Sequence, residues 1–167
     1  MSSLVPFPPL ADLPEFDISD LLQEVADVLE LVSLRRRVPI EIDAPPYMMV
    51  HGERRQLRGL LIRLIGNALT ANPAGSQIVV TAFSDEDGVE VEVADDRSES
   101  AELLHLDPRH GPRLAAFGNR SQPLAQQQIV AACGARISVS GCPEGGVATT
   151  VQFPRVRGKD AESRKAA

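Results

Sequence analysis

Three side chains in this sequence have the types and spacing that a small-ligand site requires: Arg63, Asn67 and Asp95. Arg63 and Asn67 lie four residues apart in a stretch with helical periodicity, which places them one turn apart. Asp95 follows the alternating Val/Glu run 89–93. Arginine does not deprotonate, so Arg63 is a candidate for binding an anion and not for general-base catalysis. Asn near a helix end and Asp at a strand end are also common without any ligand, so the pattern alone leaves both interpretations open.

Several other kinds of site are not expected. The histidines, His51, His105 and His110, form no cluster with the cysteines at metal-ligand spacing. Two cysteines, Cys133 and Cys142, are too few for a disulfide framework and are interpreted as small, partly buried thiols. An aromatic content of 4% and a formal net charge of −6 argue against a nucleic-acid partner. A nucleotide site stays compatible with this charge, because it needs only a few local charges.

Length and hydropathy indicate one domain that does not insert into a membrane. The 167 residues are enough to bury a core without disulfides or metals. No window reaches the roughly eighteen apolar residues of a membrane helix. Residues 1–9 lack the basic region and apolar run of a secretory signal. We therefore expect a cytoplasmic protein.

Hydrophobic periodicity predicts the helices and strands that must position the candidate groups. Asp17 is expected to cap the first helix, and Gly134 to end the last one. The segment Asp85–Gly88 has the composition of a hairpin turn. The helices are expected at about 18–37, 53–71 and 122–133, and the strands at 38–43, 47–50, 77–83, 89–93, 135–140 and 147–153.

The order of these elements predicts an α/β fold. We expect a two-layer sandwich in which a mixed, mostly antiparallel sheet carries about three helices on one face. The globular domain is expected over residues 16–156. Residues 1–15 are Pro-rich and are interpreted as a linker or an arm on a partner surface. Residues 157–167 are interpreted as a charged, disordered tail, and 96–122 as a long loop, of a length that is usually functional or mobile.

Five strings in a common order resemble the ATP-binding domain of sensor histidine kinases. This Bergerat-type domain of the GHKL superfamily also occurs in gyrase-type topoisomerases and anti-sigma kinases. The resemblance covers about residues 16–154. No one string is specific, but five at sensible spacing are fairly specific. The strings are Gly52–Leu57, Leu64–Leu69, Val91–Asp95, Ile129–Ile137 and the closing strand, with Gly145-Gly146 and then Thr150–Pro154.

The resemblance implies a magnesium–ATP site and a role for each candidate residue. Asn67 matches the asparagine that ligates the magnesium, and its amide oxygen suits this hard cation. Asp95 matches the aspartate that accepts a hydrogen bond from the adenine amino group. Thr150 lies in the closing strand, whose threonine supports that aspartate. Arg63 departs from the family pattern: it either contacts a phosphate directly or pairs with Asp95 or Asp96 and fills the pocket.

The phosphate-binding glycines of the family are missing from this sequence. Arg97 and Glu99 occupy the first glycine box, and residues 120–125, including Gln122, replace the second. Glycines let the backbone pass close to the phosphates with amide hydrogens pointing inward. A side chain held in the left-handed conformation costs about 1–2 kcal/mol. Glu99 and Asp96 would also repel a triphosphate. Binding of Mg-ATP is therefore expected to be weak or lost.

Three functions agree with this pattern. The first is a degenerate module, a pseudokinase, that binds a response regulator, a kinase, a transcription factor or a second copy of itself. The second is a working ATP-binding domain of a sensor histidine kinase that uses Asn67 and Asp95. The third is an anti-sigma-factor-like switch. No catalytic residue is assigned, because no helical hairpin with a phosphoacceptor histidine precedes Asp17. A complete protein of this kind cannot autophosphorylate by that route; in a fragment of a larger kinase, the Pro-rich start is the former linker.

Overall fold

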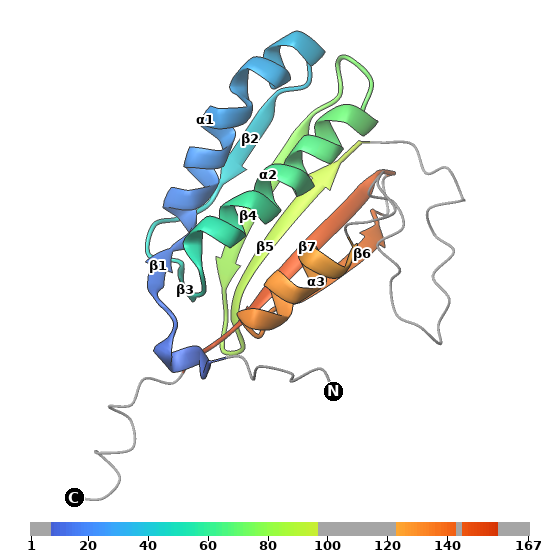
Figure 1. Ribbon diagram of the computed structural model, residues 1–167. Helices are drawn as coiled ribbons and strands as arrows, with labels where there is room; N and C mark the ends of the chain where they lie inside the picture. Colours follow the sequence, from blue (N-terminus) through green and yellow to red (C-terminus); the bar gives the residue numbers. More distant parts are fainter. Residues whose placement is uncertain (1–7, 97–122, 143–144, 157–167) are drawn as a thin grey trace, which may run out of the picture.

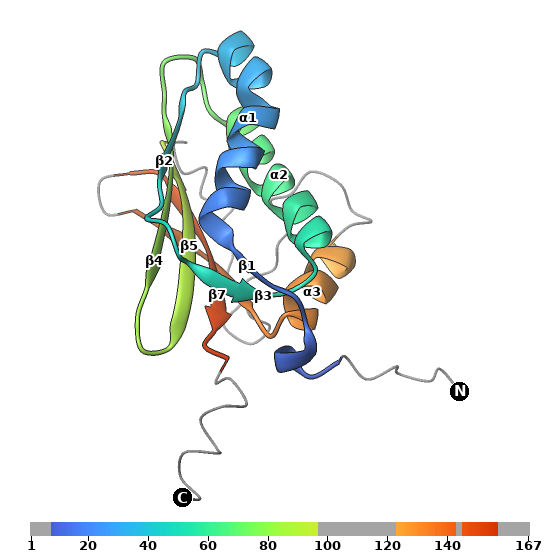
Figure 2. The ribbon, with the colours of Figure 1, turned by 90° about the vertical axis from the view of Figure 1, so that its left-hand side faces the viewer.

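A five-stranded sheet with helices on one face forms the body of the protein (Figures 1 and 2). The computed structural model describes residues 8–96, 123–142 and 145–156. Strand β2 is parallel to β4, and the other neighbouring strands are antiparallel. The predicted mixed, mostly antiparallel sheet is therefore confirmed. The strand order is β2 (Ile40–Asp43), β4 (Ile78–Ser84), β5 (Gly88–Asp95), β7 (Val147–Pro154) and β6 (Arg136–Gly141).

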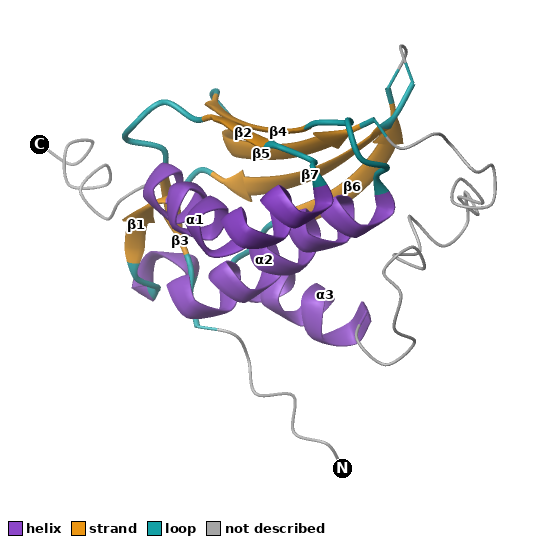
Figure 3. Ribbon diagram, turned by 90° about the horizontal axis from the view of Figure 1, so that it is seen from above, coloured by secondary structure: helices purple, strands orange, loops and turns teal. Residues whose placement is uncertain are grey.

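The helical layer consists of α1 (Ile18–Arg36), α2 (Arg54–Ala71) and α3 (Pro123–Ala132). All three lie against the same face of the sheet, with α2 in the middle (Figure 3). Helix α1 lies on the side of β2, and α3 lies on the side of β6. The predicted two-layer α/β sandwich with three helices on one face is confirmed for the described residues.

The core lies between the two layers. Helices α1 and α2 each bury a stripe of apolar residues that recur every three or four positions. In β5, Val91 and Val93 face the helices, whereas Glu90 and Glu92 face the open side, as the alternation predicted. The largest fully buried side chains are Phe153, Ile18, Leu21, Leu22, Leu57, Leu60, Leu61, Ile65, Leu69, Ile78, Val25 and Val38.

A second, two-stranded sheet joins the N-terminal residues to the domain. Strand β1 (Glu15–Asp17) pairs antiparallel with β3 (Met49–His51), and a 3-10 helix, η1, precedes it at Leu10–Asp12. The strand predicted at 47–50 therefore forms outside the main sheet. The Leu10 side chain lies against Gly134, where an added Cβ would be 2.7 Å from Leu10 Cδ1. Residues 10–17 thus pack on the domain itself. From the sequence alone, residues up to 15 are interpreted as a linker or an arm on a partner surface.

Asp17 connects the start of α1 to the segment before β3. Its Oδ1 accepts hydrogen bonds from the backbone N–H of Ser19 at 2.9 Å and of Met48 at 3.1 Å, and its Oδ2 accepts one from Tyr47 at 2.6 Å. The predicted N-cap is confirmed. Burial by itself raises the pKa of Asp17, but the hydrogen bonds from these amides outweigh it and hold the pKa below its ordinary value.

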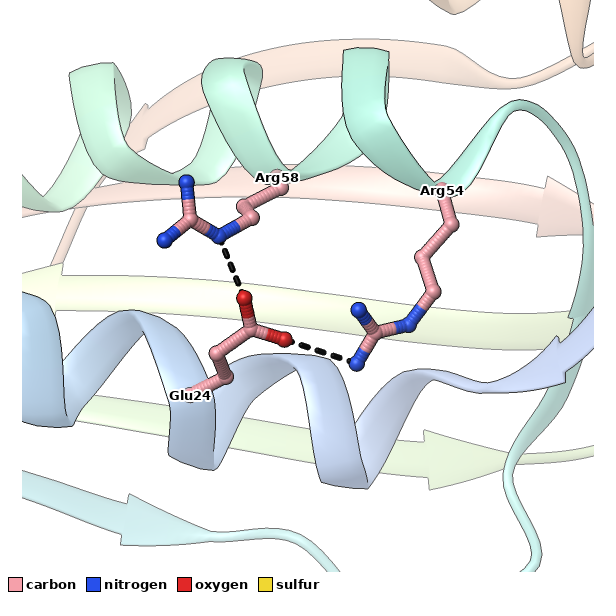
Figure 4. A network of polar contacts seen from close by, with 3 residues as sticks. All are labelled: Glu24, Arg54 and Arg58. Atoms are coloured by element: carbon pink, nitrogen blue, oxygen red, sulfur yellow. Dashed lines mark hydrogen bonds and ion pairs between the residues drawn. The ribbon is translucent and has the colours of Figure 1, made fainter.

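Glu24 links α1 to α2 at the surface. One carboxylate oxygen lies 2.8 Å from the Arg54 guanidinium, and the other accepts a hydrogen bond from Arg58 (Figure 4). The hydrogen bonds from Arg54 and Arg58 hold the pKa of Glu24 below its ordinary value. Because the two arginines lie one turn apart at the start of α2, this contact joins the first two turns of α2 to α1.

Candidate functional site

Asp95 is a buried carboxylate at the end of β5. Only 4% of the residue is exposed. It lies opposite Ile78 of β4 and Val147 of β7, so its side chain faces the helical layer together with that of Val93. A buried carboxylate needs hydrogen-bond donors, so a ligand group that binds to it must be a donor such as an amine.

Gly146 lets the start of β7 lie against the end of β5. Its φ is +100°, and an added Cβ would be 2.1 Å from the backbone oxygen of Asp95. Only glycine fits a position with this conformation and this approach. The sequence analysis quoted the pair Gly145-Gly146 but assigned Gly146 no role. The sequence signal that could have identified this role is that Gly146 directly precedes the last predicted strand.

Asn67 lies near the C-terminal end of α2 and is half-buried. Its backbone oxygen accepts a hydrogen bond from the Thr70 hydroxyl at 2.9 Å. Helix α2 and strand β5 end at the same end of the molecule (Figure 1). The fold therefore brings Asn67 and Asp95 toward a common end, from which the chain continues into residues 97–122.

Arg63 lies one turn before Asn67 and is exposed. It takes part in none of the ion pairs between residues that the structure describes. The Asp96 carboxylate instead accepts a hydrogen bond from the backbone N–H of Gln77 at 3.1 Å. The alternative in which Arg63 pairs with Asp95 or Asp96 is thus not found in this part of the chain.

The sheet register corrects the role given to Thr150. This residue lies opposite Glu92, on the open face of the sheet. Asp95 faces the helices, so the Thr150 hydroxyl is on the wrong side of the sheet to support its carboxylate. Thr149 is the threonine on the face of Asp95: it is 5% exposed and lies opposite Val93. A pattern of two adjacent threonines does not tell which one faces inward.

Val147 is the residue directly opposite Asp95. It is 6% exposed, and its side chain faces the helices as that of Asp95 does. Valine carries no hydrogen-bonding group, so it offers the carboxylate no hydroxyl. Sequence reasoning did not single out Val147, because only the register of β5 against β7 identifies the cross-strand neighbour of Asp95.

The described residues fit part of a magnesium–nucleotide site. Asp95 has the burial that recognition of the adenine amine requires, and the Asn67 amide is a suitable oxygen ligand. Within the described ranges, no three His, Cys, Asp or Glu side chains gather into a metal-binding group. Magnesium would therefore depend on Asn67 and on the phosphates of the nucleotide. Arg97, Glu99 and Gln122, on the predicted phosphate side, lie outside the described residues, as do His105 and His110.

The two cysteines have the environment that the sequence predicted. Cys133 is buried at the end of α3, and Cys142 is half-buried after β6. Burial raises the pKa of the Cys133 thiol, which disfavours the reactive thiolate. Among the helices described, none combines the length and the apolar character that crossing a membrane requires.

The fold is that of the catalytic, ATP-binding domain of histidine kinases. The catalytic domain of the histidine kinase ThkA is similar with a TM-score of 0.71 at 20% identity, covering 86% of this chain and 96% of that domain. The ATP-binding domain of PrrB from Mycobacterium tuberculosis is similar with a TM-score of 0.64 at 20% identity, covering 87% and 99%. The histidine kinase ThkA in its complex with the response regulator protein TrrA is similar with a TM-score of 0.70 at 20% identity. This match covers 86% of this chain and 42% of the ThkA chain.

The same class is found by sequence among curated proteins. The phosphate regulon sensor protein PhoR of Pseudomonas aeruginosa (strain PAO1) is 26% identical over 160 residues, which cover 88% of this chain and 35% of PhoR. The chain thus spans about a third of the length of this relative. No family model matches the sequence. The resemblance drawn from five short strings is confirmed at the level of the fold.

Proposed function

We propose that this chain is a degenerate histidine-kinase-type domain that binds a signalling partner in cytoplasmic two-component-type regulation. In this role it binds ATP weakly or not at all. The partner class is a response regulator or a kinase, since a structure with the same fold, ThkA, was solved with the response regulator protein TrrA.

The observation that carries this proposal is the replacement of the phosphate-binding glycines that the resemblance implies. Arg97 and Glu99 stand at two of those positions in the sequence, and Glu99 would repel a triphosphate. On the adenine side, the Thr150 hydroxyl lies on the open face of the sheet, away from Asp95.

A second function is favoured by the burial of Asp95. In this alternative the chain is a working Mg-ATP-binding domain in which Asp95 binds the adenine amine and Asn67 the magnesium. Exposed Arg63, one turn from Asn67, would then bind a phosphate in place of the missing backbone amides.

Titration with Mg-ADP and Mg-ATP decides between the two functions. We expect no saturable heat in calorimetry at nucleotide concentrations up to about 1 mM, and no rise in melting temperature. A ligand present at a hundred times its Kd stabilises the native state by about 2.7 kcal/mol, so a working site would be easy to detect.

The matched control for this experiment lies on the same strand as Asp95. In the second function, Asp95→Asn abolishes nucleotide binding, whereas Glu92→Gln leaves it unchanged because Glu92 faces the open side of the sheet. Micromolar binding with this difference between the two variants would overturn the proposed loss of ATP binding.

A further inference from the structure

The C-terminal half of α1 carries apolar side chains that the fold leaves uncovered. Leu31 is 67% exposed, Leu34 65%, Val28 47% and Val32 40%. We call these four residues the α1 outer patch. The buried stripe of the same helix uses other positions, Ile18, Leu21, Leu22, Val25, Leu29 and Ser33. A helix that is apolar on two sides is typically covered on both, and exposed apolar patches mark interaction sites.

The position of α1 in the layer leaves this patch accessible. Helix α1 packs on one face of the sheet beside α2, near β2, which is an edge strand (Figure 3). Val28 and Leu31 lie four and seven residues after Glu24, which contacts Arg54 and Arg58 of α2, so the patch lies on the outer surface of α1 on the side of α2. Because these side chains are exposed in the described fold, a partner can lie over this outer surface without displacing a described element.

Two opposite charges flank the patch at equal distances from Leu31. Asp27 lies four residues before Leu31 and Arg35 four residues after it, and both are exposed. Asp27 accepts a hydrogen bond from the Gln23 side chain at 3.2 Å. Neither takes part in an ion pair between described residues. This arrangement is self-complementary, because reversing the direction of the helix exchanges the acid and the base.

We propose that the α1 outer patch binds the same patch of a second copy of this chain, with the two α1 helices antiparallel. A two-fold axis at Leu31 packs Leu31 on its own copy, Val28 on Leu34, and Asp27 on Arg35. A parallel pair would instead place Asp27 against Asp27 and Arg35 against Arg35. The Asp27 and Arg35 charges thus favour the antiparallel direction. Three apolar side chains per copy, Val28, Leu31 and Leu34, share the face that meets the second copy, so the interface is small and the dimer is weak and concentration-dependent.

The mass of the full chain in solution tests the proposal. Sedimentation equilibrium over a range of concentrations is expected to show a monomer–dimer equilibrium in the micromolar range. Leu31→Lys weakens the dimer at least about tenfold, because it places two ammonium groups together on the axis. Phe83→Lys is the control: Phe83 is 45% exposed on β4, and its cross-strand neighbour is Glu90, so dimerisation is unchanged.

Charge reversal tests the antiparallel register. Asp27→Arg and Arg35→Asp each place like charges together and weaken the dimer at least about tenfold, while the double variant returns to within about threefold of the original. The two positions are eight residues, or about 12 Å, apart along one helix, so the rescue cannot come from within a chain. A monomer at all concentrations, a dimer indifferent to Leu31→Lys, or a double variant weaker than either single one overturns the proposal.

Discussion

Replacing Gly146 by alanine is expected to lower the free energy of unfolding by about 2–5 kcal/mol, because strain and overlap add at this position. The backbone has a φ of +100°, and the new Cβ would be 2.1 Å from the backbone oxygen of Asp95. Neither group belongs to a flexible side chain, so the strands β5 and β7 must move apart where they pair. Urea unfolding followed by circular dichroism measures the loss.

Gly145 provides the matched control for this prediction. Its φ is +95°, close to that of Gly146, but an added Cβ has no heavy atom within 4 Å. Gly145→Ala is therefore expected to cost only the conformational strain, about 1–2 kcal/mol. The difference between the two variants isolates the close approach to Asp95. Equal losses would show that this approach does not constrain the sheet.

Asp17→Ala is expected to lower the free energy of unfolding by about 2–4 kcal/mol, since it removes a helix N-cap and leaves further backbone amides without their acceptor. The wild-type carboxylate accepts from Ser19, Tyr47 and Met48, which joins α1 to the segment before β3. Asp20→Ala, in the first turn of the same helix, is the control. Asp20 is exposed and only interacts with the helix dipole, so we expect a loss below about 1 kcal/mol.

The loss caused by Asp17→Ala is expected to depend on pH. The pKa of Asp17 is lowered in the folded state, so its ionised form stabilises the fold. This stabilisation is fully present above the unfolded pKa and is lost as the pH falls through the folded pKa, that is, below about pH 4. Unfolding at pH 7, 5, 4 and 3 should therefore show the gap between wild type and variant closing at the acid end. A gap that stays constant down to pH 3 would contradict this account.

The sequence predicted the elements of the fold well because each has its own local signal. Helix α1 has an N-cap at Asp17 and an apolar stripe, and the structure starts it at Ile18. The hairpin predicted at Asp85–Gly88 forms, with the Asp85 carboxylate accepting hydrogen bonds from the N–H of Asp87 and Gly88. Strand β1 escaped prediction, since three residues are too few to show a period and its pairing with β3 is non-local.

The candidate site was predictable in its residue types but not in its pairings. Asp95 does lie buried at a strand end, and Asn67 lies on α2 toward the same end of the molecule. Thr150 faces the open side of the sheet, away from Asp95, whereas its neighbour Thr149 faces inward. Because side chains alternate along a strand, a shift of one residue moves a hydroxyl from one face to the other.

The sequence by itself determined the helices, the strands of the five-stranded sheet, the fold class and the absence of phosphate-binding glycines, because these depend on residue type and local period. Only the tertiary structure decided that Val147 faces Asp95, that Arg63 does not pair with it among the described residues, and that α1 keeps an exposed apolar patch. Each of these depends on which segments meet in space. The register of β5 against β7 and the packing of α1 beside α2 set those contacts. Both involve segments that are distant in the sequence, so local residue patterns do not predict them.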